Sequence, residues 1–189
     1  MLTDEQILQD LEKLKTIAAD HKAVGSEYET ETATIAGLEL DVFKNIPENL
    51  GELYRKGLVA GDKDFLVYQN ERFSFEEAFD LARRMARVLL EQFQVKPGDS
   101  VAVCARNSPE WCISYMAISL MGAIVVPMNS WWKGPELKYG LNDSGSKLIF
   151  IDPARLSLLE PFLGELNVEI VQIKPELETV FPEFYELAK

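Results

Sequence analysis

Histidine and cysteine are nearly absent from this 189-residue chain, which holds a single histidine, His21, and two cysteines, Cys104 and Cys112. One imidazole excludes a metal site built from several histidines and leaves only one possible base for a nucleophile–base pair. His21 lies in an acidic, polar stretch, where a solvated surface histidine is the ordinary outcome. Because the two thiols form no CxxC motif, we expect neither a zinc site nor a disulfide scaffold, and a reducing, cytoplasmic compartment fits.

Long hydrophobic runs and clustered positive charge are also missing. The first residues, MLTDEQILQD, are acidic where a signal peptide is basic, and no apolar run reaches the ~18 residues that span a membrane. Lysine and arginine number 19 against 31 acids, so the net charge is −12. This charge repels phosphate backbones, and no basic run opposes it. We therefore expect no membrane span, no export and no nucleic acid partner.

What the chain does contain is typical of a globular protein, because 47% of its residues are hydrophobic and 10% are aromatic. Its length suggests one domain with an appendage. Residues 1–45 hold ten acids against four bases. Thr3 and Gln6 form a capping-box pattern before apolar residues at helical spacing, which predicts a helix over 3–19. The following GSEYETETATIAG has few large apolar residues, so we expect residues 1–45 to be an acidic helix and an irregular linker.

The rest of the chain, 46–189, alternates between two periodicities. FLVYQ and RFSF flank a tight turn and predict a hairpin, and Ser74 with Glu77 opens a helix that runs to about Phe93. Buried strands are then expected at SVAVCA (100–105), AIVVPM (123–128), KLIFI (147–151) and VEIVQI (168–173), with helices between them. This order predicts an α/β fold, an open doubly wound and mainly parallel sheet with helices on both faces. The tail PELETVFPEFYELAK is expected to be a loop followed by the start of another element.

Neither of the two common nucleotide-phosphate loops, GxGxxG and GxxxxGK[ST], occurs in the chain. In a sheet of this kind, ligands bind at the carboxyl ends of the strands, so the loops RNSPEW, NSWWKGPE and DPAR would carry a site. Only Arg106, Lys133 and Arg155 in these loops could contact an anion, and solvated side chains are the alternative.

The adjacent tryptophans Trp131 and Trp132 are the most unusual pair in the sequence. On a polar loop they could line an apolar substrate tunnel or contact a partner surface, since tryptophan is enriched at interfaces. Alternatively, one ring packs on the end of the sheet and the other on the neighbouring helix. Cys112, at a helical position, is expected to be a small buried side chain.

Three stretches read together resemble a known family. FSFEEAFDLARRMARVLLEQFQVKPGDSVAVCARNSPEW, AISLMGAIVVPMN and PELKYGLNDSGSKLIFID occur in the order and with the gaps seen in the N-terminal part of AMP-forming acyl- and aryl-CoA synthetases. The resemblance covers about residues 46–189. It implies adenylation of a carboxylic acid by Mg·ATP, followed by thioester formation with coenzyme A, in a full-length enzyme.

The resemblance also implies that this chain is catalytically incomplete. The family's phosphate loop, its adenine and ribose contacts and its catalytic lysine have no counterpart here, so no catalytic residue, metal ligand or cofactor is assigned to these 189 residues. Arg155 stands near an arginine that binds the coenzyme A nucleotide in some relatives and is the one candidate for that role. Lys133-Gly134-Pro135 departs from the family, in which a threonine or serine caps the helix.

Two hypotheses remain open for function. The first is an N-terminal fragment of an acid–CoA ligase, which the unfinished helical pattern of FPEFYELAK favours. The second is a stand-alone scaffold or interaction module derived from such a ligase, which would use the helix over 3–19 and the tryptophan pair. The expected partner is the remainder of the ligase, or a second copy bound through an exposed apolar face.

Overall fold

A computed structural model of the protein describes residues 3–174 and 183–189. The chain divides into two compact units, Met1–Glu48 and Asn49–Lys189. None of the helices in these described ranges is long and apolar enough to cross a membrane.

The N-terminal unit begins with helix α1 (Asp4–His21). The predicted capping box is present: the Thr3 hydroxyl accepts a hydrogen bond from the Gln6 amide, and the Gln6 side chain accepts one from the Thr3 amide. These contacts satisfy two N–H groups that a helix start otherwise leaves unpaired, which explains why the helix begins where the sequence predicts. None of the residues of α1 is buried.

The predicted irregular linker is wrong, because residues 30–43 form an antiparallel hairpin. Strands β1 (Thr30–Ile35) and β2 (Leu38–Phe43) pair in register from Thr30 with Phe43 to Ile35 with Leu38. Alternating threonines favour an extended backbone, and Ala36 and Gly37, both at positive φ, form the two-residue turn. The prediction rested on the scarcity of large apolar residues in this segment, whereas the alternating β-branched threonines decide its structure.

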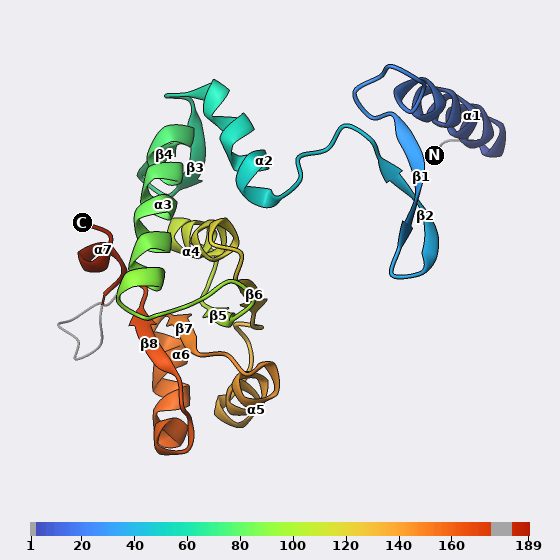
Figure 1. Ribbon diagram of the computed structural model, residues 1–189. Coiled ribbons are helices and arrows are strands. Elements are labelled where there is room, and N and C mark those ends of the chain that lie inside the picture. Colours follow the sequence, from blue (N-terminus) through green and yellow to red (C-terminus); the bar gives the residue numbers. More distant parts are fainter. Residues whose placement is uncertain (1–2, 175–182) are drawn as a thin grey trace. The chain divides into compact units, whose positions relative to one another are not determined.

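The second unit contains a four-stranded parallel sheet, which confirms the predicted fold class. Its strands are β5 (Ser100–Cys104), β6 (Ile124–Pro127), β7 (Leu148–Ile151) and β8 (Glu169–Gln172), in the spatial order β6-β5-β7-β8 (Figure 1). The helices that connect or cover them are α3 (Phe75–Glu91), α4 (Pro109–Leu120), α5 (Gly134–Ser144), α6 (Pro153–Leu159) with the 3-10 turn η2 (Glu160–Glu165), and α7 (Phe184–Leu187).

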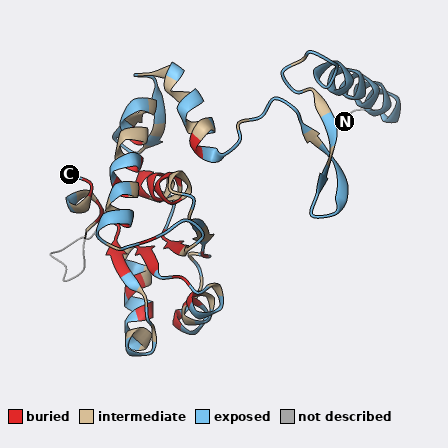
Figure 2. Ribbon diagram, in the orientation of Figure 1, coloured by how far each residue is buried: buried red, intermediate tan, exposed pale blue. Residues whose placement is uncertain are grey.

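The two faces of the sheet bury two separate cores, as a doubly wound fold requires. On one face, Val101 and Val103 of β5 pack with side chains from α3, α4 and α7. On the other, Ala102 and Cys104 pack with side chains from α5 and α6. Because successive strand residues point to opposite faces, a strand buried on both sides needs a continuous apolar run, and SVAVC supplies it. Figure 2 shows the buried residues concentrated in this sheet and its helices.

The capping box predicted at Ser74 and Glu77 begins α3. The Ser108 hydroxyl caps α4, and Gly145, at a φ of +61°, ends α5 in the left-handed conformation. The hairpin before α3 is also as predicted, with strands β3 (Asp64–Tyr68) and β4 (Glu71–Ser74).

Two features differ from the predictions for this unit. Helix α2 (Leu50–Gly57), capped by Asn49, and the 3-10 turn η1 (Leu58–Ala60) were not predicted. Helix α7 agrees with the start of an element in the C-terminal tail, but the loop expected before it falls largely on 175–182, outside the described residues.

Candidate functional site

The strand order places the expected ligand site between β5 and β7. From β5 the chain crosses to β6 on one side and then returns to β7 on the other, so the connections diverge at this point. In open α/β sheets, ligands bind in the crevice outside the carboxyl ends of the strands at such a reversal. Here the crevice is formed by Ala105 and Arg106, which follow β5, and by Asp152, which follows β7.

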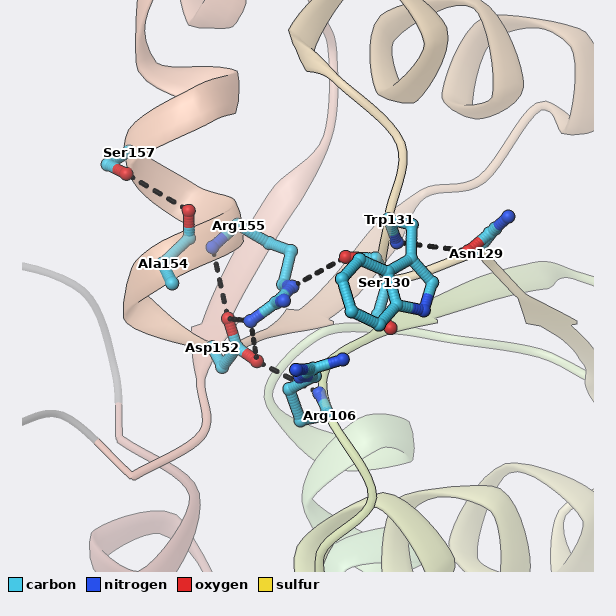
Figure 3. A network of polar contacts seen from close by, with 8 residues as sticks. All are labelled: Arg106, Asn129, Ser130, Trp131, Asp152, Ala154, Arg155 and Ser157. Carbon is cyan, nitrogen blue, oxygen red and sulfur yellow. Dashed lines mark hydrogen bonds and ion pairs between the residues drawn. The ribbon is translucent and has the colours of Figure 1, made fainter.

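Asp152 joins the loops at this end of the sheet (Figure 3). One carboxylate oxygen, Oδ2, accepts a hydrogen bond of 3.0 Å from the Arg106 amide. The other, Oδ1, accepts one of 3.0 Å from the Arg155 amide and caps α6. The same carboxylate pairs with Nη1 of Arg155 at 3.0 and 3.2 Å. Asp152 therefore holds the start of α6, the end of β5 and the half-buried Arg155 guanidinium at once.

Arg155 completes this network from the first turn of α6. Its Nε donates to the Ser130 carbonyl at 2.9 Å, which ties the loop after β6 to the other two. The Arg155 and Asp152 side chains are each only 14% exposed. The guanidinium predicted to contact a coenzyme A phosphate thus lies in an internal ion pair, where a phosphate would compete with Asp152. Its role in nucleotide binding stays a prediction.

The two tryptophans of the loop after β6 have different surroundings. Trp131 is 73% exposed, and the Arg106 guanidinium lies 4.2 Å from its ring centroid, within the range of a cation–π contact. Trp132 is half-buried and packs against the core cluster that contains Leu137 of α5. The loop therefore combines an inward ring that fastens it to a helix with an outward ring that stays accessible. Lys133, the third cation considered from sequence, is exposed.

Close packing requires glycine at position 134, next to the N-cap Lys133. Gly134 is the first residue of α5, and a Cβ built there would lie 2.3 Å from the backbone carbonyl oxygen of Leu158. No side chain fits at that distance without moving α5 away from α6. The cap is supplied instead from Glu136, whose carboxylate accepts a hydrogen bond of 2.8 Å from the Lys133 amide.

A small cavity opens beside this network. It has a volume of about 270 Å³ and is lined by residues that include Arg106, Asp152, Arg155, Tyr68 and Lys174. Sites for drug-sized ligands measure roughly 300–1,000 Å³, so the cavity lies just below that range. Of its cations, Arg155 is paired with Asp152 and Lys174 with Glu71 and Glu110, whereas Arg106 lies over the Trp131 ring.

A second polar cluster, which sequence reasoning missed, lies around Glu110. This glutamate of α4 is fully buried, and its Oε1 accepts a hydrogen bond of 2.7 Å from the Tyr185 hydroxyl. Lys174, just after β8, contacts the same oxygen at 3.3 Å and Glu71 of β4 at 2.7 Å, and its ammonium lies over the Tyr68 ring. No local motif marks these residues, because α4, β4 and the two C-terminal segments meet only in the folded chain.

Charge and burial act in opposite directions within this cluster. Burial lowers the pKa of Lys174, but its hydrogen bonds to Glu71 and Glu110 outweigh that effect, so its pKa is raised above the usual value. Burial, together with the hydrogen bond to Glu110, raises the pKa of Tyr185 far above its usual value. Both groups therefore keep their protons across the physiological range and remain donors to the Glu110 carboxylate.

The thiols do not add a reactive centre to the site. Burial, with a smaller contribution from the Asp152 charge, raises the pKa of Cys104 to about 12. Cys112, predicted to be buried, is only half-buried, and burial raises its pKa as well. Within 3–174 and 183–189, no group of three or more histidine, cysteine or acidic side chains could hold a metal ion.

Comparison with known proteins assigns the body of the chain to a family. Residues 54–184 match the family model described as AMP-binding enzyme. The chain belongs to the AMP-binding enzyme family. Among similar proteins, 4-hydroxybutyrate–CoA ligase 2 of Metallosphaera sedula is 29% identical over 125 residues, which make up 66% of this chain and 21% of that protein. Long-chain-fatty-acid–CoA ligase FadD13 of Mycobacterium tuberculosis is 36% identical over 78 residues, 41% of this chain and 15% of that protein.

Solved structures of this family share the fold. The anthranilate–CoA ligase AuaEII in complex with anthranoyl-AMP superposes with a TM-score of 0.71 at 25% identity, covering 76% of this chain and 29% of that chain. Coronafacic acid ligase from Pectobacterium brasiliense gives a TM-score of 0.66 at 22% identity, covering 74% of this chain and 29% of that one. This chain thus spans about a fifth of the length of 4-hydroxybutyrate–CoA ligase 2 and less than a third of these two structures.

Proposed function

We propose that this chain is the N-terminal portion of an AMP-forming carboxylic acid–CoA ligase and that it is catalytically incomplete on its own. The observation that carries the proposal is the match of residues 54–184 to the AMP-binding family. The ligases to which the chain is similar support the same assignment, since their names describe the joining of a carboxylic acid to coenzyme A.

The full reaction has two steps. A carboxylate oxygen attacks the α-phosphorus of ATP, which forms the acyl-adenylate and releases pyrophosphate. The thiol of coenzyme A then attacks the acyl carbonyl carbon, which forms the thioester and releases AMP. Magnesium, when bound with ATP, would offset the phosphate charges in the first step.

The contribution of this chain is structural support at the carboxyl end of its sheet. The Asp152–Arg155 pair fixes the loops after β5, β6 and β7 relative to one another, and Trp131 stays exposed on one of them. Loops held in this way by buried ionic contacts form a rigid surface against which a further part of an active site can pack. Carboxylate activation would depend on groups in that further part.

The experiment is an assay for pyrophosphate release by the purified chain, supplied with Mg·ATP and a panel of fatty, hydroxy and aromatic acids. A full-length acid–CoA ligase serves as the positive control. We expect no carboxylate-dependent release from this chain. Turnover that follows the chain through purification and is abolished by heat would refute catalytic incompleteness.

The second candidate, a non-catalytic interaction module, is favoured by one observation in the N-terminal unit. Five apolar side chains of α1 are between 45% and 64% exposed, which is unusual for an amphipathic helix in a finished fold: Ile7, Leu8, Leu11, Leu14 and Ile17. Loss of association on substitution in α1, with no pyrophosphate release by the unsubstituted chain in the assay above, would support this role.

A further inference from the structure

Helix α1 carries an apolar stripe that nothing else in its own unit buries. Ile7, Leu11, Leu14 and Ala18 recur at spacings of four, three and four residues and therefore lie on one face of the helix. The three larger side chains are 45%, 48% and 61% exposed. Figure 2 shows the helix coloured as exposed along its length.

The neighbouring hairpin does not cover this stripe. Residues directly opposite each other in an antiparallel pair share a face, so Ala33, Ile35, Leu38 and Leu40 form the apolar face of the β1–β2 hairpin. Ile35, Leu38 and Leu40 are themselves 45% to 63% exposed. The stripe of α1 thus remains available for a partner.

The charges of α1 are divided between its two halves. Residues 4–12 contain four acids and no base: Asp4, Glu5, Asp10 and Glu12. Residues 13–22 contain three bases and one acid: Lys13, Lys15, Lys22 and Asp20. The two ion pairs within the helix, Lys13 with Asp10 and Lys15 with Glu12, are more than half exposed and can be exchanged for others at little cost.

We propose that the occupant of this stripe is the α1 helix of a second copy of the chain, packed antiparallel. An antiparallel pair centred between Glu12 and Lys13 sets Leu11 of one copy against Leu14 of the other and Ile7 against Ala18. The acidic first half of each helix then lies along the basic second half of its partner. A parallel pair would instead place acids beside acids at one end and bases beside bases at the other.

This inference is independent of the proposed ligase chemistry, because residues 1–48 lie outside the segment that matches the family. It assigns the N-terminal unit a role in dimerisation. Closed two-fold pairing also hides an apolar face that a soluble protein rarely leaves exposed.

The first test is sedimentation of the whole 189-residue chain over a concentration series. We expect a monomer–dimer equilibrium, and Leu11→Asp should raise the dimer dissociation constant roughly tenfold or more, since it places a charge in the seam. The matched control is Gln9→Asp, which adds the same charge on the opposite face of α1 and should leave the constant unchanged. Because the side chain of Leu11 is about half exposed, its substitution should leave the circular dichroism spectrum unaltered.

The second test reads the orientation. Chains carrying Ile7→Cys are mixed with chains carrying Ala18→Cys and oxidised, and the antiparallel pair predicts a disulfide between the two variants. The unsubstituted chain, whose Cys104 is buried and Cys112 half-buried, gives the background. A chain that stays monomeric throughout, a dimer unaffected by Leu11→Asp, or a disulfide between two Ile7→Cys chains in place of the mixed one would overturn the proposal.

Discussion

Replacing Asp152 should destabilise the Asn49–Lys189 unit more than any single surface substitution. In Asp152→Ala, loss of the α6 cap costs about 1 kcal/mol. The substitution also leaves the Arg155 guanidinium without its counter-ion in a position that is only 14% exposed. Breaking a buried pair costs ~3–5 kcal/mol, and the lower end applies because some solvent reaches this one. The free energy of unfolding should therefore fall by about 4 kcal/mol, a large part of the ~5–15 kcal/mol typical of a domain.

Two companion variants separate the contributions. Asp152→Asn keeps the cap, since asparagine is as good a capping residue, but loses the charge, so we expect a loss of about 2 kcal/mol. Arg155→Met leaves the Asp152 carboxylate with its two backbone hydrogen bonds but no cation and should cost about 2 kcal/mol as well. An arginine reserved for a ligand phosphate would instead be nearly neutral to stability.

Urea unfolding followed by tryptophan fluorescence is the appropriate assay. All three tryptophans, Trp111, Trp131 and Trp132, lie in the Asn49–Lys189 unit, so the signal reports this unit without the N-terminal one. The reasoning is refuted if Asp152→Ala shifts the free energy of unfolding by less than about 1 kcal/mol, or if asparagine is as harmful as alanine, because the cap and the ion pair would then not both contribute.

Three further outcomes are expected. Gly134→Ser should lower the free energy of unfolding by ~2 kcal/mol in urea titration, because its Cβ would meet the Leu158 carbonyl oxygen; a gain in stability would contradict the contact geometry. Because burial raises the pKa of Cys104 to about 12, this thiol stays protonated at pH 8, and peptide mapping should find it unmodified by a thiol reagent until urea is added. Lys174→Met should lower the free energy of unfolding by about 2 kcal/mol, because it leaves the buried Glu110 without its cation. Adding Glu110→Gln should restore at least half of that loss, whereas additive effects of the two substitutions would show that the residues are not coupled.

The sequence was informative wherever structure depends on neighbours along the chain. Ser74 with Glu77 and the run SVAVC each act within a few residues, and the helix and the strand that they predict are both present. The hairpin at 30–43 was missed although its threonine alternation and Ala36-Gly37 turn are local, because composition was given more weight than periodicity.

The site was predictable only in part. The predicted topology alone places Arg106 and Arg155 at the same edge of the sheet. Topology alone does not predict the ion pair between Asp152 and Arg155, because the pair also depends on the geometry with which Asp152 caps α6. The contact between Glu110 and Tyr185 joins residues 75 apart in sequence and depends on how α7 packs, which no local pattern encodes.

The measurement that tests the central claim most directly is a chimera of 4-hydroxybutyrate–CoA ligase 2 in which residues 54–184 of this chain replace the matched segment. Pyrophosphate release from Mg·ATP with 4-hydroxybutyrate is compared with that of the parent enzyme and of a form lacking the segment altogether. If this chain is the N-terminal portion of an acid–CoA ligase, the chimera releases pyrophosphate and the shortened form does not. A chimera that folds with the parent's circular dichroism spectrum yet is as inactive as the shortened form would contradict the account.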